Sequence, residues 1–332
     1  MKNTLKTLIF TSLFALATLV SCDDGNDPTK DENLVEITVT GIDDDVTIMK
    51  GSVIKIYIEV DDHDLVDNLD LKLNGTVLES FTSFPAEYFW NTSQFEIGEQ
   101  VISLQAYLNE KKIGLKEFDI EITAPLTVTD YDGNVYHTVQ IGSQIWMVEN
   151  LKTTHYRNGD AISPINVSGS WDQLTAGGYC SYDNNAANGE IYGKLYNFYA
   201  VEDSREIAPE GWHVPTREEY KTLLIYLGGS DVAGGKMKEA GSEHWTTDLI
   251  TDENTGTNES GFTALPGGWL TASGDFASQG YKAYFWTIDG FDSGISGSRY
   301  GYARWLGLNT DKFYDASNYH AYMGMSVRCV KD

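Results

Sequence analysis

Residues 34–124 alternate apolar and polar side chains with a period of two, and this alternation restricts the fold of the segment more than any other feature of the chain. It is clearest at Leu69, Leu71 and Leu73, and it recurs in residues 35–39, 54–60, 102–108 and 118–122. Successive side chains of a strand point to opposite faces, so each run predicts a strand with one buried face. Asn74 and Gly75 form a typical tight hairpin turn. The segment therefore predicts about seven short strands, as in an all-β immunoglobulin-like sandwich.

The composition changes after Ala124 and Pro125. Seven of the eight tryptophans and seventeen of the twenty tyrosines lie in residues 125–332. Thr216 and Glu219 have the spacing of a capping box, and apolar residues at helical spacing follow them. A second short helix is predicted over residues 232–240. The remainder is rich in short strands, glycine turns and long loops, so residues 125–332 predict an α+β domain whose loops are held by aromatic side chains.

The first 22 residues have the features of a bacterial lipoprotein signal peptide. Lys2 and Lys6 precede a mostly apolar stretch over residues 8–20, and Cys22 closes the segment. The stretch is too short for a stable membrane span. We therefore expect cleavage before Cys22 and attachment of diacylglycerol and a fatty acid such as palmitate there. Residues 23–33, which lack core-forming side chains, predict a flexible acidic linker.

The formal net charge of −26 limits the classes of partner. A strongly negative field repels phosphate backbones and anionic head groups, so nucleic acid is excluded as a partner. Contact with a membrane is expected only through the N-terminal lipid. The expected location is the cell envelope, at the outer membrane, facing either the periplasm or the outside.

Six sequence segments occur in an order that resembles a known family. They are 130–136 (DYDGNVY), 141–151 (IGSQIWMVENL), 192–197 (YGKLYN), 211–216 (GWHVPT), 258–268 (NESGFTALPGG) and 326–332 (SVRCVKD). Together they resemble the Fibrobacter succinogenes major paralogous domain (FISUMP), found in bacterial surface proteins and lipoproteins, over about residues 128–332. GWHVPT also resembles a segment of the formylglycine-generating enzyme family. Both resemblances imply a C-type-lectin-like fold, in which the two ends of the domain pair.

Two cysteines remain besides Cys22. An exported chain meets an oxidising compartment, which permits a disulfide between Cys180 and Cys329. The family resemblance implies a different partner for Cys329, at the position that Ala208 occupies here. Whether Cys180 replaces that partner, or both thiols stay free and buried, is left open by the sequence.

No pattern of catalytic or metal-binding residues is present. The six histidines are scattered and none has a known metal-ligand spacing. Asp130, Asp132 and Asn134 imitate the start of a calcium loop, but Ile141 stands where that loop needs a glutamate. An acidic loop at residues 61–67 is better explained as solvated than as a calcium site. We therefore expect no enzyme activity, no cofactor and no metal, with calcium disfavoured.

Ten tryptophans and tyrosines gather in residues 269–322 and form the most informative candidate site. Aromatic rings beside amides and carboxylates suit sugars, and Tyr and Trp also dominate protein interfaces. Trp286 and Trp305 have apolar or small neighbours, so we expect them inside the domain. The tyrosines expected to face solvent and bind a ligand are Tyr281, Tyr300, Tyr314 and Tyr319.

These features predict a cell-envelope lipoprotein with a non-enzymatic binding or adhesion role for a glycan or a protein at the cell surface. The first alternative is a structural or assembly component of the envelope. The second is an enzyme built on a formylglycine-generating-like scaffold.

Overall fold

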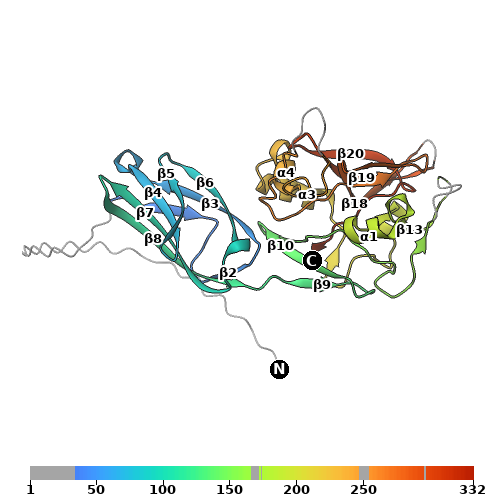
Figure 1. Ribbon diagram of the computed structural model, residues 1–332, viewed down its shortest axis with the longest axis horizontal. Coiled ribbons are helices and arrows are strands. Elements are labelled where there is room, and N and C mark those ends of the chain that lie inside the picture. The colour runs from blue at the N-terminus through green and yellow to red at the C-terminus, as the bar shows by residue number, and fades with distance from the viewer. Residues whose placement is uncertain (1–33, 166–171, 173, 247–253, 295–296) are drawn as a thin grey trace, which may run out of the picture. The chain divides into compact units, whose positions relative to one another are not determined.

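The computed structural model describes residues 34–165, 172, 174–246, 254–294 and 297–332 (Figure 1). Asn33–Asp332 forms one compact unit. One cluster of buried apolar side chains is drawn from residues 35–122, and three further clusters from residues 136–330. The expected signal peptide, the lipid site Cys22 and the linker 23–33 lie outside the described residues. Within the described part, no helix has the length and apolarity needed to cross a membrane.

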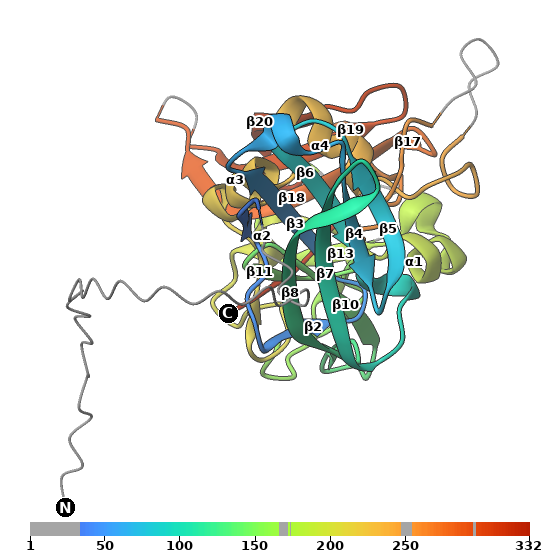
Figure 2. The same cartoon turned by 90° about the vertical axis from the view of Figure 1, so that its left-hand side faces the viewer.

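Eight strands form the first domain, in two sheets. The strands are β1 (Ile37–Thr40), β2 (Val46–Met49), β3 (Val53–Val60), β4 (Asn68–Leu73), β5 (Thr76–Phe81), β6 (Ala86–Asn91), β7 (Gly98–Leu108) and β8 (Lys111–Thr123). β3 lies between β1 and β6, and the second sheet has the order β2-β8-β7-β4-β5 (Figure 2). Only β2 and β8 are parallel within these sheets. This division of strands confirms the predicted immunoglobulin-like sandwich.

The alternation seen in the sequence accounts for the core of the sandwich. Ile56 and Ile58 of β3 and Leu71 of β4 have no exposed surface. Burying each such side chain contributes about 1.5–3 kcal/mol before the loss of chain entropy is counted. Asn74 and Gly75 both have positive φ angles, 48° and 80°, as a type I′ turn requires. The predicted hairpin between β4 and β5 is therefore confirmed.

The C-terminal domain is built mainly from strands in three sheets. One contains β9 (Thr127–Thr129), β10 (Val135–Ile141), β11 (Gln144–Met147), β21 (Val330–Lys331) and β15 (Trp212–His213), and it continues into β3, β1 and β6 through the parallel pairing of Ile141 with Val53. The smallest contains β12 (Ser163–Pro164), β13 (Gly178–Cys180) and β14 (Leu195–Tyr196). The third has the order β17-β16-β18-β19-β20, with β16 (Gly267–Leu270), β17 (Phe276–Gln279), β18 (Lys282–Asp292), β19 (Arg299–Gly307) and β20 (Phe313–His320).

Four short α-helices accompany these sheets in the described residues. They are α1 (Ala186–Tyr192), α2 (Phe198–Val201), α3 (Arg217–Tyr226) and α4 (Ser230–Met237). The predicted capping box begins α3: the Glu219 amide donates to Thr216 Oγ1 at 3.2 Å, and the Thr216 amide donates to Glu219 at 2.7 Å. The second predicted helix is α4, which begins and ends earlier than expected. It ends at Met237 because the backbone of Lys238 is extended.

α3 covers one face of the sheet β17-β16-β18-β19-β20. Tyr220 and Leu223 of α3 share a buried cluster with Phe285, Leu306 and Phe313. The neighbouring side chains on these strands alternate in direction, so Tyr284, Trp305 and Tyr314 lie on the face away from α3. This second face carries the candidate site.

The possible disulfide between Cys180 and Cys329 is not formed in this structure, so that alternative is wrong. Both cysteines are free and buried. Cys180 packs with Leu195 and Leu270, whereas Cys329 belongs to the larger cluster around Trp212 and Trp286. The two side chains lie in separate clusters, and each packs there as a small apolar side chain. Burial raises the pKa of each thiol to about 12.

Candidate binding surface

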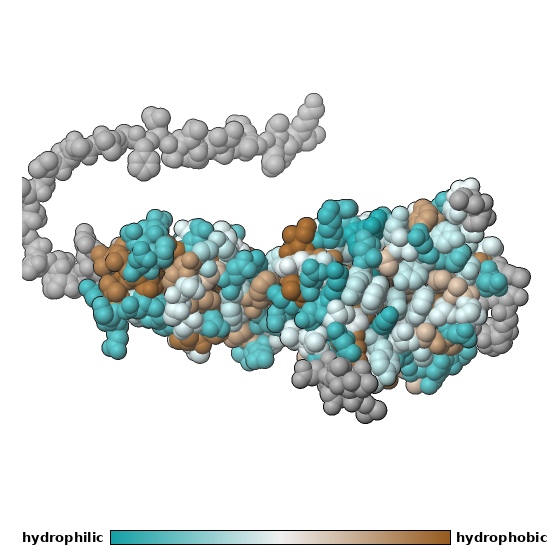
Figure 3. Space-filling model, turned by 90° about the horizontal axis from the view of Figure 1, so that it is seen from above, coloured by the Kyte–Doolittle hydropathy of each residue, from teal (hydrophilic) through white to brown (hydrophobic). Residues whose placement is uncertain are grey.

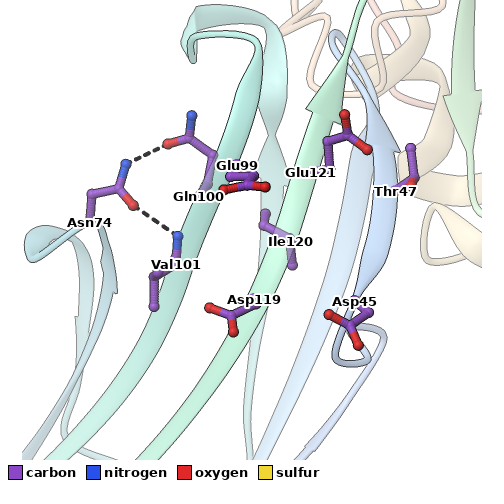
Figure 4. Close-up of a pocket in the computed structure, with 9 residues that line it drawn as sticks. All are labelled: Asp45, Thr47, Asn74, Glu99, Gln100, Val101, Asp119, Ile120 and Glu121. Atoms are coloured by element: carbon purple, nitrogen blue, oxygen red, sulfur yellow. Dashed lines mark hydrogen bonds between the residues drawn. The ribbon is translucent and has the colours of Figure 1, made fainter.

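A concavity lies on the outer side of the sandwich, over β7 and β8 (Figure 4). It has a volume of about 660 Å³ and is open to solvent. Its carboxylates are those of Asp45, Glu99, Asp119 and Glu121, and Glu99 lies directly opposite Glu121 across the two strands. Like charges at such positions repel each other. The concavity is therefore an acidic surface rather than an enclosed site with converging hydrogen-bond donors.

The described histidines are already engaged by protein groups. His63, His137, His155, His213 and His244 each lie beside a carboxylate. His320 instead stacks between the rings of Tyr300 and Tyr322.

Within the described part of the chain, one group of three side chains has ligand atoms close enough to hold a metal ion: Glu239, Glu243 and His244. His244 Nδ1 lies 2.8 Å from Glu239 Oε1. This hydrogen bond accounts for the arrangement without an ion, and Glu243 is exposed. The group is therefore explained as a surface ion pair.

The segment that imitates a calcium loop uses its oxygens within the protein. Asp130 accepts hydrogen bonds from the backbone and side chain of Asn134 and from the hydroxyl of Tyr136. Asp132 accepts from the amide and hydroxyl of Thr154. These hydrogen bonds hold the turn before β10 and tie it to Thr154.

Four rings form a continuous stack across four strands, which we call the aromatic row: Trp269, Tyr284, Trp305 and Tyr314. Tyr284 is 5.0 Å from Trp269 and 6.2 Å from Trp305, measured between ring centres, with interplanar angles of 25° and 28°. Trp305 and Tyr314 are closer and almost parallel, at 3.9 Å and 6°. The rings meet because Tyr284, Trp305 and Tyr314 occupy directly paired positions on β18, β19 and β20. Each strand thus supplies one ring at the same level of the sheet.

One ring of the aromatic row is buried, and the other three are partly exposed. Tyr284 is 5% exposed, whereas Trp269, Trp305 and Tyr314 are half-buried. Burial raises the pKa of Tyr284 above its ordinary value. Tyr319 packs edge-on against Trp269 at 5.6 Å between ring centres. The Lys282 ammonium lies 4.6 Å from the centre of a Trp305 ring.

A second stack lies on the opposite face, toward the far ends of β18 and β19. It comprises Phe291, Tyr300, His320 and Tyr322, with ring centres 5.4, 4.4 and 4.9 Å apart in that order. All four side chains are half-buried. Tyr300 and Trp305 are five residues apart on one strand, which places the two stacks on opposite faces.

The structure separates the four tyrosines that the sequence singled out. Tyr281 is exposed, 49%, and lies in the turn before β18. Tyr314 belongs to the aromatic row and Tyr300 to the second stack, while Tyr319 packs against the row. Burial raises the pKa of Tyr319. Only Tyr281 is therefore as open as expected, and the other three are half-buried.

The two tryptophans expected inside behave differently. Trp286 is fully buried and its Nε1 donates to the carbonyl of Tyr196 at 2.8 Å. Trp305 lies on the same face of the sheet but is half-buried: its ring neighbours Tyr314 of the edge strand β20 and Lys282, whereas Trp286 packs against Phe198 of α2. The expectation for Trp305 is therefore wrong.

Sequence reasoning missed the charged groups beside the row. Lys312 Nζ lies 2.9 Å from Asp231 Oδ1 and 5.7 Å from the centre of the Tyr314 ring. Asp231 is on α4, far from Tyr314 in sequence, and no local pattern connects the two. In Figure 3 the visible face of the C-terminal domain is mostly hydrophilic or near neutral, with small hydrophobic patches.

The profile of the Fibrobacter succinogenes major domain matches residues 139–331 of the chain. The comparison with curated proteins finds no match. Among solved structures, the chain is similar to the fibronectin(III)-like modules of Clostridium thermocellum CbhA, with 20% identity, coverage of 27% of this chain and 98% of that one, and a TM-score of 0.23. It is also similar to a calcium-binding mutant of Bacteroides uniformis β-glucuronidase 2, with 10% identity, coverage of 90% and 30%, and a TM-score of 0.25. At TM-scores this low, neither similarity supports a conclusion about the fold or the activity of this chain.

Proposed function

This chain belongs to the Fibrobacter succinogenes major domain family, and we propose that it is a non-enzymatic binding protein of the cell envelope. The observation that carries the proposal is the aromatic row, in which half-buried Trp269, Trp305 and Tyr314 are held in register by β16, β19 and β20. Rings fixed by stacking lose little entropy on binding, which favours recognition. The ligand is a glycan or a surface protein.

The proposal includes a C-type-lectin-like architecture for residues 125–332, related to that of formylglycine-generating enzymes. Its support is the pairing of the two ends of the domain: Trp146 of β11 pairs with Val330 of β21. In this arrangement the rigid sheets carry a loop-rich recognition face.

The proposal places the protein on the outer membrane through a lipid at Cys22. Its support is the sequence of residues 1–22, with a basic start and an apolar stretch that ends at this cysteine. Cys22→Ala is expected to move the protein from the membrane fraction to the soluble fraction while its melting temperature stays unchanged. A Cys22→Ala protein that still needs detergent for extraction would contradict the anchoring.

The binding function is tested with a glycan array and with purified surface proteins of the same bacterium. The chain is compared with a double variant at the two end rings of the aromatic row, Trp269→Ala with Tyr314→Ala. The double variant is expected to lose about tenfold or more in affinity, as interface aromatics do, at a nearly unchanged melting temperature. If neither ligand class binds the unmodified chain, the structural or assembly role replaces this proposal.

A further inference from the structure

The outermost ring of the aromatic row belongs to Tyr314, and we propose that one sugar ring of an uncharged polysaccharide stacks on it. This inference rests on the proposed binding function and names its ligand class. It concerns the site formed by Tyr314, Lys312 and Asp231, which we call the edge site.

Trp269 and Tyr314 are the two end rings of the row, and each stacks on a single ring among the described residues, but only Tyr314 lies on the edge strand of the sheet, since β17 lies beyond β16. β20 is the last strand of its sheet, so no described strand lies beyond it. Trp305 covers the inner face of the Tyr314 ring at 3.9 Å, nearly parallel. By contrast, Tyr284 and Trp305 each have a ring on both sides. Sugar C–H groups stack on an open, rigid aromatic face. In the aromatic row, Tyr314 supplies such a face.

The ion pair beside this ring supplies the polar contacts that a sugar needs. Lys312 Nζ and Asp231 Oδ1 are 2.9 Å apart, and their side chains are 46% and 80% exposed. The ammonium lies over the Tyr314 ring, 5.7 Å from its centre. An ammonium donates hydrogen bonds and a carboxylate accepts them. The pair can therefore bind adjacent hydroxyl groups of a sugar that rests on Tyr314.

The charge of the protein selects between polysaccharides. A chain with a formal net charge of −26 repels a polyanion such as a polyuronate. An uncharged polysaccharide experiences no such repulsion, and its binding depends little on salt. A basic protein partner would instead be attracted, and its binding would weaken as salt screens the charges. Salt dependence thus separates the two classes of ligand.

The test measures binding of the full chain in detergent to three probes: soluble β-glucan, mannan and polygalacturonate. Titrations are done at about 0.05 M and about 0.5 M NaCl, where screening differs strongly. We expect binding to β-glucan or mannan with the same affinity at both salt concentrations. Tyr314→Ala is expected to weaken it about tenfold or more, whereas Tyr314→Phe, which keeps the ring, stays within about threefold.

Tyr131→Ala is the matched control, because Tyr131 is an exposed tyrosine of the same domain that lies outside the candidate segment 269–322. It should bind as the unmodified chain does. Equal glycan binding by Tyr314→Ala would overturn the edge site while leaving the binding function standing. Preference for polygalacturonate, or salt-sensitive binding, would overturn the ligand class. If none of the three probes binds, the inference is overturned. The glycan array and the purified surface proteins then test the binding function separately.

Discussion

Arg328 donates two hydrogen bonds to the same oxygen of Asn150, at 3.0 Å from Nε and 2.7 Å from Nη2. The guanidinium is fully buried, and its Nη1 donates to the carbonyls of Met147 and Phe262. These residues come from three of the segments that carry the family resemblance. Those segments therefore meet in the core, where they hold the fold together rather than line a binding surface.

Asn150→Ala is expected to destabilise the protein by about 3 kcal/mol, because it leaves a buried cation without its main acceptor. Adding Arg328→Met to this variant removes the unpaired charge, so the double variant should be less destabilised than the sum of the single variants. Chemical denaturation of the four proteins measures this coupling. Asn309→Ala, at an exposed amide, is the control. Additive effects would show that the contact does not act as a pair.

Trp286→Ala is expected to cost about 3–5 kcal/mol of stability, as large cavities in a core do. Trp286 has no exposed surface, and its ring packs 5.3 Å from that of Phe198. Tyr281→Ala should stay within about 0.5 kcal/mol of the unmodified chain, because its side chain is exposed. Denaturation midpoints compare the two. Similar losses at both positions would contradict the division between buried and open aromatics.

His213 makes part of the stability depend on pH. Its Nδ1 lies 2.7 Å from Asp332 and its Nε2 2.7 Å from Glu219. Burial alone lowers the pKa of His213, but the hydrogen bonds to the two carboxylates outweigh it and raise the pKa. A raised pKa means that the folded state holds the proton more tightly. The stabilisation by His213 is therefore fully present below about pH 6.5, the pKa of histidine in the unfolded chain. It is lost as the pH rises through the higher pKa of His213 in the folded state.

His213→Gln should accordingly lower the melting temperature more at acidic pH than at alkaline pH. Thermal melts of both proteins across this range measure the difference. His63→Gln serves as the control, since His63 is exposed. An equal loss at all pH values would show that only packing, and not the charge, matters at position 213.

Cys180 and Cys329 are expected to react slowly with alkylating reagents in the native state. Both are buried, and burial raises the pKa of each to about 12, so little thiolate is present at neutral pH. In denaturant without reductant both should react fully, as counted by mass spectrometry. A mass two hydrogens lower, with no reactive thiol at either position, would show that the bridge forms after all.

Local sequence determined much of the fold. The period-two runs of residues 34–124 predict the strands of the sandwich, because a strand with one buried face needs apolar residues at alternate positions. Asn74 and Gly75 predict the hairpin, because few other pairs accept two positive φ angles. Thr216 and Glu219 predict the start of α3 for an equally local reason.

The tertiary structure alone decided which aromatic rings meet and which stay open. Tyr284, Trp305 and Tyr314 stack because the register of β18, β19 and β20 places them at one level, and register depends on pairing between distant residues. Trp305 has apolar neighbours in sequence, yet it is half-buried because it stacks beside Tyr314 of the edge strand, whereas Trp286 on the same face is covered by Phe198. Cys180 and Cys329 stay apart because they pack into different clusters. Neighbours along the chain determine local conformation, whereas exposure and contact are set by the packing of one layer on another.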